Sequence, residues 1–185
     1  ALVGSVIASG GSLAYLYLTI KGKVKPNKIT WFFWGLFPLI AFSAQIYQGV
    51  GLVAWATFAA GAAPFLVLIA SSFNPEAYWK LSRTDYILAV IAIISMLLWW
   101  VTSNASIAIA FAIGADLAAA LPTLIKMYKF PETESWRAFL FPIVGFGLAL
   151  LTLNIWTFEN YAFVLYLFLI NVTLASLGFF NERLR

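Results

Sequence analysis

Hydrophobic residues fill long stretches of this chain, and short polar breaks separate the stretches. Crossing a bilayer takes about 20 helical residues, and roughly 17 suffice for a short crossing. Seven stretches approach or exceed that length, and the fourth is the shortest. They cover residues 2–20, 31–47, 52–73, 86–101, 106–127, 136–153 and 161–180. The pattern predicts an all-α membrane protein with seven transmembrane helices, and the breaks are too short to hold a soluble domain.

The basic residues alternate with these stretches. All eleven lie in, or at the edges of, the breaks after the first, third and fifth stretches and in the tail, and the other breaks contain none. Cytoplasmic loops carry an excess of Lys and Arg. We therefore expect an integral protein of a bacterial cytoplasmic membrane, with the N-terminus outside and the C-terminus in the cytoplasm. The positions are Lys21, Lys23, Lys25, Lys28, Lys80, Arg83, Lys126, Lys129, Arg137, Arg183 and Arg185.

Composition supports a lipid environment and narrows the chemistry. The chain is 63% hydrophobic and 10% charged, against about 45–50% and 25% in soluble domains. It contains neither cysteine nor histidine, which removes thiolate ligands and the commonest general base. The net charge of +4 resides in the loops, so we expect membrane lipid and no nucleic acid as a partner. We expect no catalytic site, no metal and no cofactor.

A short segment recurs at an offset of 105 residues. Residues 21–31 align with residues 126–136, and each segment lies between two apolar stretches. This repeat predicts two parallel three-helix units, residues 1–73 and 105–185, joined by a connector helix in residues 74–104. Two similar helix starts on the cytoplasmic side are the alternative, because Thr or Ser before Trp is also a helix-capping signal. The matching pairs are Lys21 and Lys126, Pro26 and Pro131, Thr30 and Ser135, and Trp31 and Trp136.

The segment from Leu121 to Ser135, with Pro122-Thr123 followed by Lys126 and Lys129, resembles the proline-glutamine motif of the PQ-loop superfamily, with Thr in place of Gln. That superfamily includes the SWEET sugar transporters. The resemblance implies a 3+1+3 helix arrangement and transport of a small solute, and it also admits receptors without transport activity. Trp31-Phe-Phe-Trp34 is similar to a pattern of Pnu-type vitamin transporters, although interfacial anchoring of the two indoles explains these residues more simply.

Asp116 is the only acidic residue inside a predicted span, and it lies midway along it. A carboxylate at a helix centre costs about 2.5–3.5 kcal/mol, so it normally faces a cavity or a partner. We expect Asp116 to bind a polar solute group or to carry a coupling proton. Hydrogen bonding that joins helices is the structural alternative.

Other polar and helix-breaking positions complete the expected site. Asn171 lies near the middle of the last span, where the SWEET resemblance implies an asparagine that hydrogen-bonds the solute. Prolines inside spans remove backbone hydrogen bonds and tend to kink helices. We expect them to act as hinges, and neutral accommodation by neighbouring helices is the alternative. The prolines are Pro38, Pro64, Pro122 and Pro142.

The combined expectation is a transporter of a small polar solute, sugar-like or vitamin-like, that works by alternating access around a midplane cavity. The alternative is a PQ-loop-like receptor or binding protein of the same fold without transport activity. Because both predicted repeats are present in one chain, a monomer can suffice, and a homo-oligomer stays open.

Overall fold

A computed structural model describes residues 2–75 and 83–183, and the regular secondary structure of these residues is helical. The prediction of an all-α protein is confirmed. The described elements are α1 (Leu2–Ile20), α2 (Lys28–Tyr47), α3 (Ala54–Ser71), α4 (Arg83–Thr102), α5 (Ala105–Lys129), the 3-10 helices η1 (Pro131–Thr133) and η2 (Trp136–Phe139), α6 (Leu140–Leu151) and α7 (Phe158–Arg183).

Apolar helices dominate the described residues. The helices α2, α3, α5 and α7 each contain a stretch long and apolar enough to cross a membrane. Shorter apolar helical stretches cover Val6–Ile20 and Trp136–Leu151. These helices are consistent with an integral membrane protein, because a helix satisfies its backbone hydrogen bonds internally and can therefore enter lipid.

Asparagine side chains set the starts of two helices. Asn27 Oδ1 accepts from Ile29 N at 3.0 Å, and α2 therefore begins at Lys28 rather than at the predicted Trp31. Asn104 Oδ1 accepts from Ser106 N at 3.0 Å and caps α5. Such caps satisfy backbone donors that the first helical turn leaves free. Hydropathy alone missed the start of α2 because Lys28 is polar.

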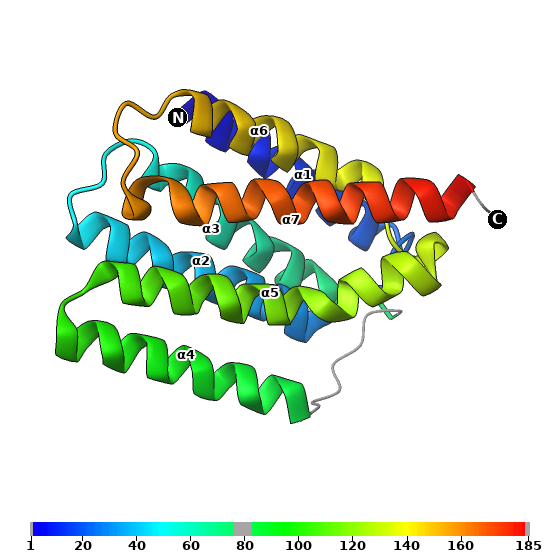
Figure 1. The fold of residues 1–185 in the computed structure, drawn as a ribbon. Helices are drawn as coiled ribbons and strands as arrows, with labels where there is room; N and C mark the ends of the chain where they lie inside the picture. Colours follow the sequence, from blue (N-terminus) through cyan, green and yellow to red (C-terminus); the bar gives the residue numbers. More distant parts are fainter. Residues whose placement is uncertain (1, 76–82, 184–185) are drawn as a thin grey trace.

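Successive α-helices run in opposite directions through the bundle (Figure 1). The C-terminal ends of α1, α3, α5 and α7 lie together at one end of the bundle, here called the basic end. The N-terminus and the connections after α2, α4 and α6 lie at the opposite end. Lys126 and Lys129 in the last turn of α5 are at the basic end, as the charge pattern predicts.

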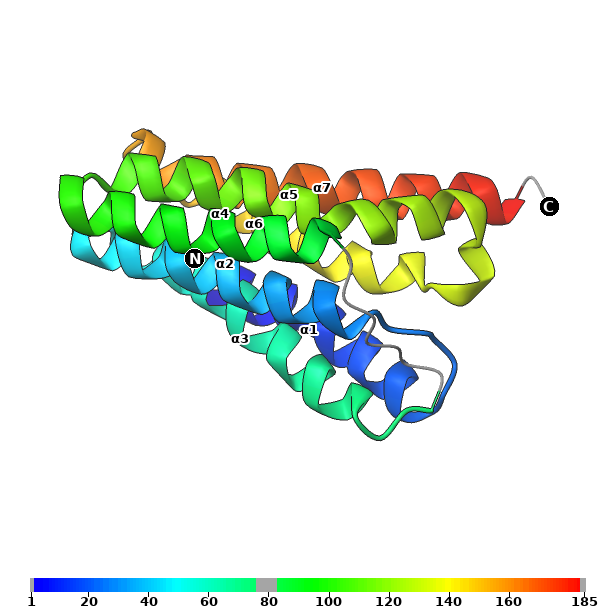
Figure 2. The same ribbon diagram turned by 90° about the horizontal axis from the view of Figure 1, so that it is seen from below.

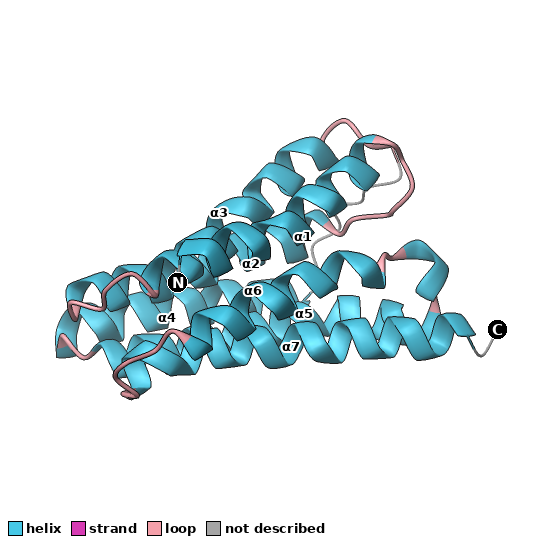
Figure 3. Cartoon of the chain, turned by 90° about the horizontal axis from the view of Figure 1, so that it is seen from above, coloured by secondary structure: helices cyan, strands magenta, loops and turns pink. Residues whose placement is uncertain are grey.

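The helices form two groups of similar internal order. In the first group α3 packs against both α1 and α2, and in the second α7 packs against both α5 and α6. The groups meet where α1 packs on α6 and α2 packs on α5, and α4 covers α5 and part of α2. Exchanging α1 for α5, α2 for α6 and α3 for α7 reproduces the same set of neighbours. The two groups diverge toward the basic end (Figures 2 and 3).

Small residues bring α1 and α6 into backbone contact. A Cβ atom on Gly145 would lie 2.4 Å from both Ala8 N and Gly4 O, and one on Gly11 would lie 2.3 Å from Ala138 O. Close approach of this kind is typical of helix interfaces in membranes, where packing replaces the hydrophobic effect as the driving force. The glycines therefore fix how the two groups meet.

The contact between α2 and α5 is built differently. Alanines at three- and four-residue spacing form one buried face of α5, and they share a hydrophobic cluster with Phe33 and Phe37 of α2. The two phenyl rings stack with centroids 5.3 Å apart. Large side chains from one helix thus fill the space left by small ones on the other. The alanines are Ala105, Ala108, Ala112, Ala115 and Ala119.

Candidate functional site

A cavity lies between the two helix groups, and α1, α2, α3, α5, α6 and α7 contribute to its wall together with η2. It extends from residues near the middle of α5 and α7 toward the basic end. Its volume is about 80 Å³, counted as space open to the centres of water molecules. One water needs roughly 10–15 Å³ on this measure, so the cavity has room for several waters or for a small solute.

The structure brings most of the sequence-predicted residues to this cavity. Asp116 and Asn171, which are 55 positions apart in the sequence, both line it. Three of the four prolines also line it, whereas Pro122 lies outside the lining. Sequence patterns could not predict the direction of any of these side chains, so their convergence is a result of tertiary packing. The lining prolines are Pro38, Pro64 and Pro142.

Asp116 is almost entirely buried, with 2% of its surface exposed. Tyr166 Oη of α7 donates a hydrogen bond of 2.6 Å to its Oδ2. Its Oδ1 has no hydrogen-bond partner among the described residues. A buried acceptor without a partner costs about 1–3 kcal/mol, and more when it is charged. The second oxygen is thus a place where a proton, a water or a solute group would be stabilised.

Asn171 lies on α7 and is also buried. Its Nδ2 donates a hydrogen bond of 2.7 Å to Leu167 O, one turn earlier in the same helix. This bond fixes the amide against its own helix, and it makes no direct bond to another helix within the described residues. The amide therefore contributes polarity to the cavity wall and does not join α7 to another described helix.

The prolines occupy different helical positions. Pro38 and Pro64 lie inside α2 and α3, where a missing N–H removes an intrahelical bond. Pro142, expected inside a helix, is the third residue of α6, directly after the 3-10 turn η2. N–H groups of the first turn lack intrahelical partners in any case. Pro142 therefore marks the change from 3-10 to α-helix rather than a break within α6.

Four aromatic rings form one continuous wall of the cavity. Tyr15 and Trp31 have ring centroids 4.6 Å apart, Trp31 and Trp34 5.2 Å, and Trp34 and Phe139 6.4 Å. All four line the cavity. We expected the two tryptophans to anchor the chain at the membrane interface, and the structure instead turns their rings inward. Hydropathy cannot show this difference, because both placements suit an amphipathic ring at a helix start.

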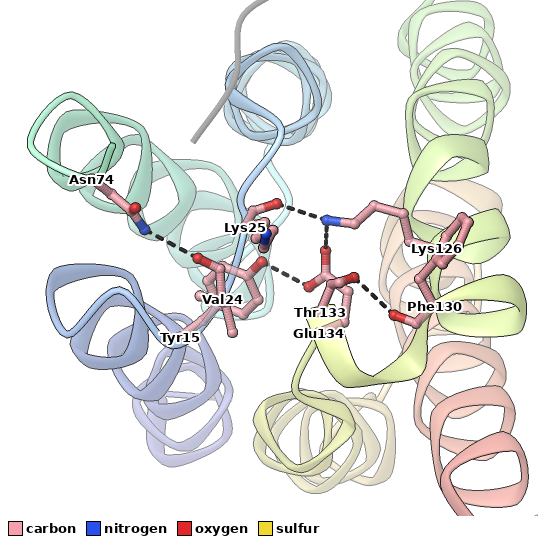
Figure 4. A network of polar contacts seen from close by, with 8 residues as sticks. All are labelled: Tyr15, Val24, Lys25, Asn74, Lys126, Phe130, Thr133 and Glu134. Carbon is pink, nitrogen blue, oxygen red and sulfur yellow. Dashed lines mark hydrogen bonds and ion pairs between the residues drawn. The ribbon is translucent and has the colours of Figure 1, made fainter. Parts of the chain in front are cut away.

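A buried polar network joins the two helix groups at the basic end (Figure 4). The Glu134 side chain is 3% exposed, and its Oε1 lies 2.6 Å from Lys126 Nζ. Tyr15 Oη donates a hydrogen bond of 2.7 Å to Glu134 Oε2. Lys126 Nζ also donates a hydrogen bond of 2.7 Å to Lys25 O. Because Tyr15 also lines the cavity, the network adjoins the cavity on this side.

Further bonds hold the segments that carry the network. Asn74 Nδ2, just after α3, donates to Thr19 O at 2.9 Å and to Val24 O at 3.1 Å. Lys25 N donates to Thr133 O at 3.4 Å across the two groups. Sequence reasoning gave no role to Glu134 or Asn74. The visible signal was that Glu134 lies eight positions after Lys126, in a segment that also contains Glu132 and several basic residues.

The electrostatics of Glu134 are unusual for a loop residue. Burial raises the pKa of Glu134 above its ordinary value of 4.5, because a charged carboxylate loses its hydration. The ion pair with Lys126 and the bond from Tyr15 lower the pKa and offset part of this effect. The network thus holds a titratable group at the junction of the two groups.

Polar contacts also connect the helices at the opposite end. Gln45 Nε2 of α2 donates a hydrogen bond of 3.0 Å to Glu159 O at the start of α7. Ser106 Oγ at the start of α5 donates a hydrogen bond to Glu159 Oε1. The Gln45–Glu159 bond joins the first helix group to the second, whereas the Ser106–Glu159 bond connects α5 and α7 within the second group. The cavity is therefore flanked by inter-group polar contacts on both sides along the bundle axis.

No protein-family model, curated protein or solved structure matches this chain. Within residues 2–75 and 83–183, no group of three or more acidic, histidine or cysteine side chains is placed to hold a metal ion. The chemistry of the cavity is therefore the basis for a functional proposal.

Proposed function

We propose that this protein transports a small polar solute across a membrane by alternating access around the cavity between its helix groups. The observation that carries the proposal is Asp116, a buried carboxylate with one unpartnered oxygen, at a cavity lined by both groups. Transporters built from repeats place their solute site near the midplane, between the repeats. A carboxylate in lipid is otherwise an unfavourable residue to retain.

We further propose a 3+1+3 organisation, in which α1–α3 and α5–α7 are repeats and α4 is the connector. Two observations of different kinds support it. The sequence repeats at an offset of 105 between residues 21–31 and 126–136, and the packing pattern is unchanged when the groups are exchanged. An odd number of connecting crossings gives both repeats the same orientation in the membrane.

In this mechanism the polar contacts at the two ends open in turn. The network of Glu134 and Lys126 closes the basic end, which the charge pattern assigns to the cytoplasm. The Gln45–Glu159 contact closes the other end. Asp116 binds a polar group of the solute or exchanges a proton during the cycle, and Asn171 hydrogen-bonds the solute. Pro38 and Pro64, which line the cavity from inside α2 and α3, permit the helix bending that this movement needs.

Uptake by proteoliposomes tests the proposal directly. Liposomes containing the full chain should accumulate at least one member of a panel of small solutes, and Asp116→Asn should reduce the initial rate at least about tenfold. Unchanged uptake by this variant would remove Asp116 from the mechanism. Solute-induced thermal stabilisation without any uptake would instead indicate a receptor of the same fold.

A further inference from the structure

We infer that the solute is a small organic cation, namely a quaternary or protonated amine. This inference rests on the proposed function and adds the chemical class of the solute. Among the described residues that line the cavity, Asp116 carries the only formal charge, and none is Lys or Arg. A low-dielectric cavity with one carboxylate and no cation favours a ligand that supplies the missing positive charge.

The carboxylate has one oxygen left for such a ligand. Tyr166 donates to Oδ2, which orients the group and leaves Oδ1 without a protein partner. An ionised carboxylate accepts several hydrogen bonds, and ion pairs strengthen as water is excluded. The nearest cationic side chain at the basic end, Lys126, is paired with Glu134 at 2.6 Å. It therefore does not replace an external cation at Asp116.

The four aromatic rings that line the cavity also favour an organic cation as the solute. Tyr15, Trp31, Trp34 and Phe139 are in successive ring contact and all line the cavity. The face of an aromatic ring, that of Trp most strongly, attracts cations, and cages of such rings are the usual way in which proteins recognise quaternary ammonium groups. One cavity is thus lined both by aromatic rings and by a carboxylate, which are the two parts of a cation site.

A sugar fits this lining less well. A sugar carries a hydroxyl on most of its carbons, and each hydroxyl needs a partner when it leaves water. The polar side chains of the lining are few, and the Tyr15 hydroxyl already donates to Glu134. A compact cation with methyl groups instead suits the apolar surface. The volume of about 80 Å³ equals roughly five to eight water positions, which matches an ion the size of choline.

Binding to the detergent-solubilised full chain tests this inference without requiring transport. Trp31 and Trp34 serve as fluorescent reporters, and the probes are choline and its neutral isostere dimethylbutanol, in which carbon replaces the quaternary nitrogen. We expect saturable quenching by choline, with an affinity at least about tenfold above that of the isostere. Equal affinity for the two probes, or no saturable binding of choline, would overturn the inference.

Two variants and a control test whether the preference for choline over the isostere arises in the cavity. Asp116→Asn should remove the preference for choline over the isostere, whereas Glu132→Gln should keep it. Glu132 is an exposed carboxylate between α5 and η2, so the control changes net charge equally but away from the cavity. Should Asp116→Asn fail to fold, Trp34→Leu should reduce the same preference by weakening the cation–ring attraction. A preference that survives in a folded Asp116→Asn or Trp34→Leu protein would contradict the assignment.

The outcomes separate this inference from the proposed function. Specific choline binding without uptake into liposomes would leave the cation site standing and would argue against transport. Uptake of a neutral solute by a protein that does not bind choline would leave transport standing and would overturn the cation assignment.

Discussion

At the scale of single residues, Glu134 shows how a loop side chain can connect two halves of a protein. Its carboxylate is buried and contacts Lys126 and Tyr15. Burial costs hydration, and the ion pair and hydrogen bond return part of that cost. Because burial dominates, the pKa of Glu134 lies above its ordinary value. The folded protein therefore holds this proton more tightly than the unfolded chain does.

This linkage predicts a pH dependence of stability. The favourable protonated form is fully populated below the ordinary pKa of 4.5, and its contribution is lost as the pH rises through the higher folded-state pKa. The thermal midpoint of the wild type should therefore fall as the pH rises above about 4.5, at a cost of at most about 1.4 kcal/mol per pH unit from this group. Glu134→Gln removes the titrating group and should flatten this part of the profile.

The exposed residue Glu132 provides the matched control for that measurement. Glu132→Gln changes the same residue type two positions away and should keep the wild-type profile. A Glu134→Gln protein that loses stability with pH as steeply as the wild type would show that Glu134 is not the responsible group.

At the scale of elements, the α1–α6 contact depends on the absence of side chains. Gly145 approaches the backbone of α1 so closely that an added methyl group would lie 2.4 Å from Ala8 N and Gly4 O. Backbone atoms cannot rotate away as side chains can, so the helices would have to separate. Gly147, on the same helix, has only the Phe168 side chain near it, at 3.5 Å.

These two glycines give a paired prediction. Gly145→Ala should destabilise the protein by about 1–3 kcal/mol through overpacking. Gly147→Ala should be near neutral, because its methyl group would make an ordinary contact. Unfolding of both variants in mixed micelles, followed by helical circular dichroism, measures the difference. Equal stability of the two proteins would mean that α1 and α6 do not approach each other as described.

Helix boundaries can be predicted from the sequence more accurately than the directions in which side chains point. The end of α1 at Ile20 and the end of α2 at Tyr47 agree with the predicted boundaries, because apolar runs end abruptly there. Asn27 was not recognised as a cap, although its position before Lys28 was a usable signal. The inward rotation of Trp31 was not predictable, because its ring contact with Tyr15 of α1 depends on how the helices are arranged in three dimensions.

At the scale of the whole molecule, helix direction and charge agree. The helices alternate in direction, and the C-terminal ends of α1, α3, α5 and α7 lie at one end of the bundle (Figure 1), where α5 carries Lys126 and Lys129 in its last turn. Charge excess on the cytoplasmic side would place that end inside the cell. Such a placement would put the Glu134 network on the cytoplasmic face and the Gln45–Glu159 contact on the outer face.

Labelling of intact cells tests this orientation. The chain has no cysteine, so single cysteines can report each end. Phe130 at the basic end is 53% exposed, and Asn154 at the opposite end is exposed. A membrane-impermeant maleimide should label Asn154→Cys in intact cells and Phe130→Cys only after lysis. Labelling of Phe130→Cys alone would reverse the orientation, and labelling of both in intact cells would contradict a membrane between the two ends.

The sequence by itself determined the helical class, the approximate extent of the helices and the presence of a carboxylate, Asp116, inside an apolar helix. These properties follow from local chemistry, because an apolar run must be shielded from water and a carboxylate within it is conspicuous. The position of a residue along its helix is a local property of this kind. Which residue of another helix it contacts is not a local property.

Only the tertiary structure decided what surrounds those residues. Tyr15 and Glu134 are 119 positions apart, and Asp116 and Tyr166 are 50 apart, so no local pattern could pair them. The rotation of each helix about its axis depends on the best packing of all its neighbours at once, including small residues such as Gly145. That rotation encloses Asp116 and turns the rings of Trp31 and Trp34 into the same cavity.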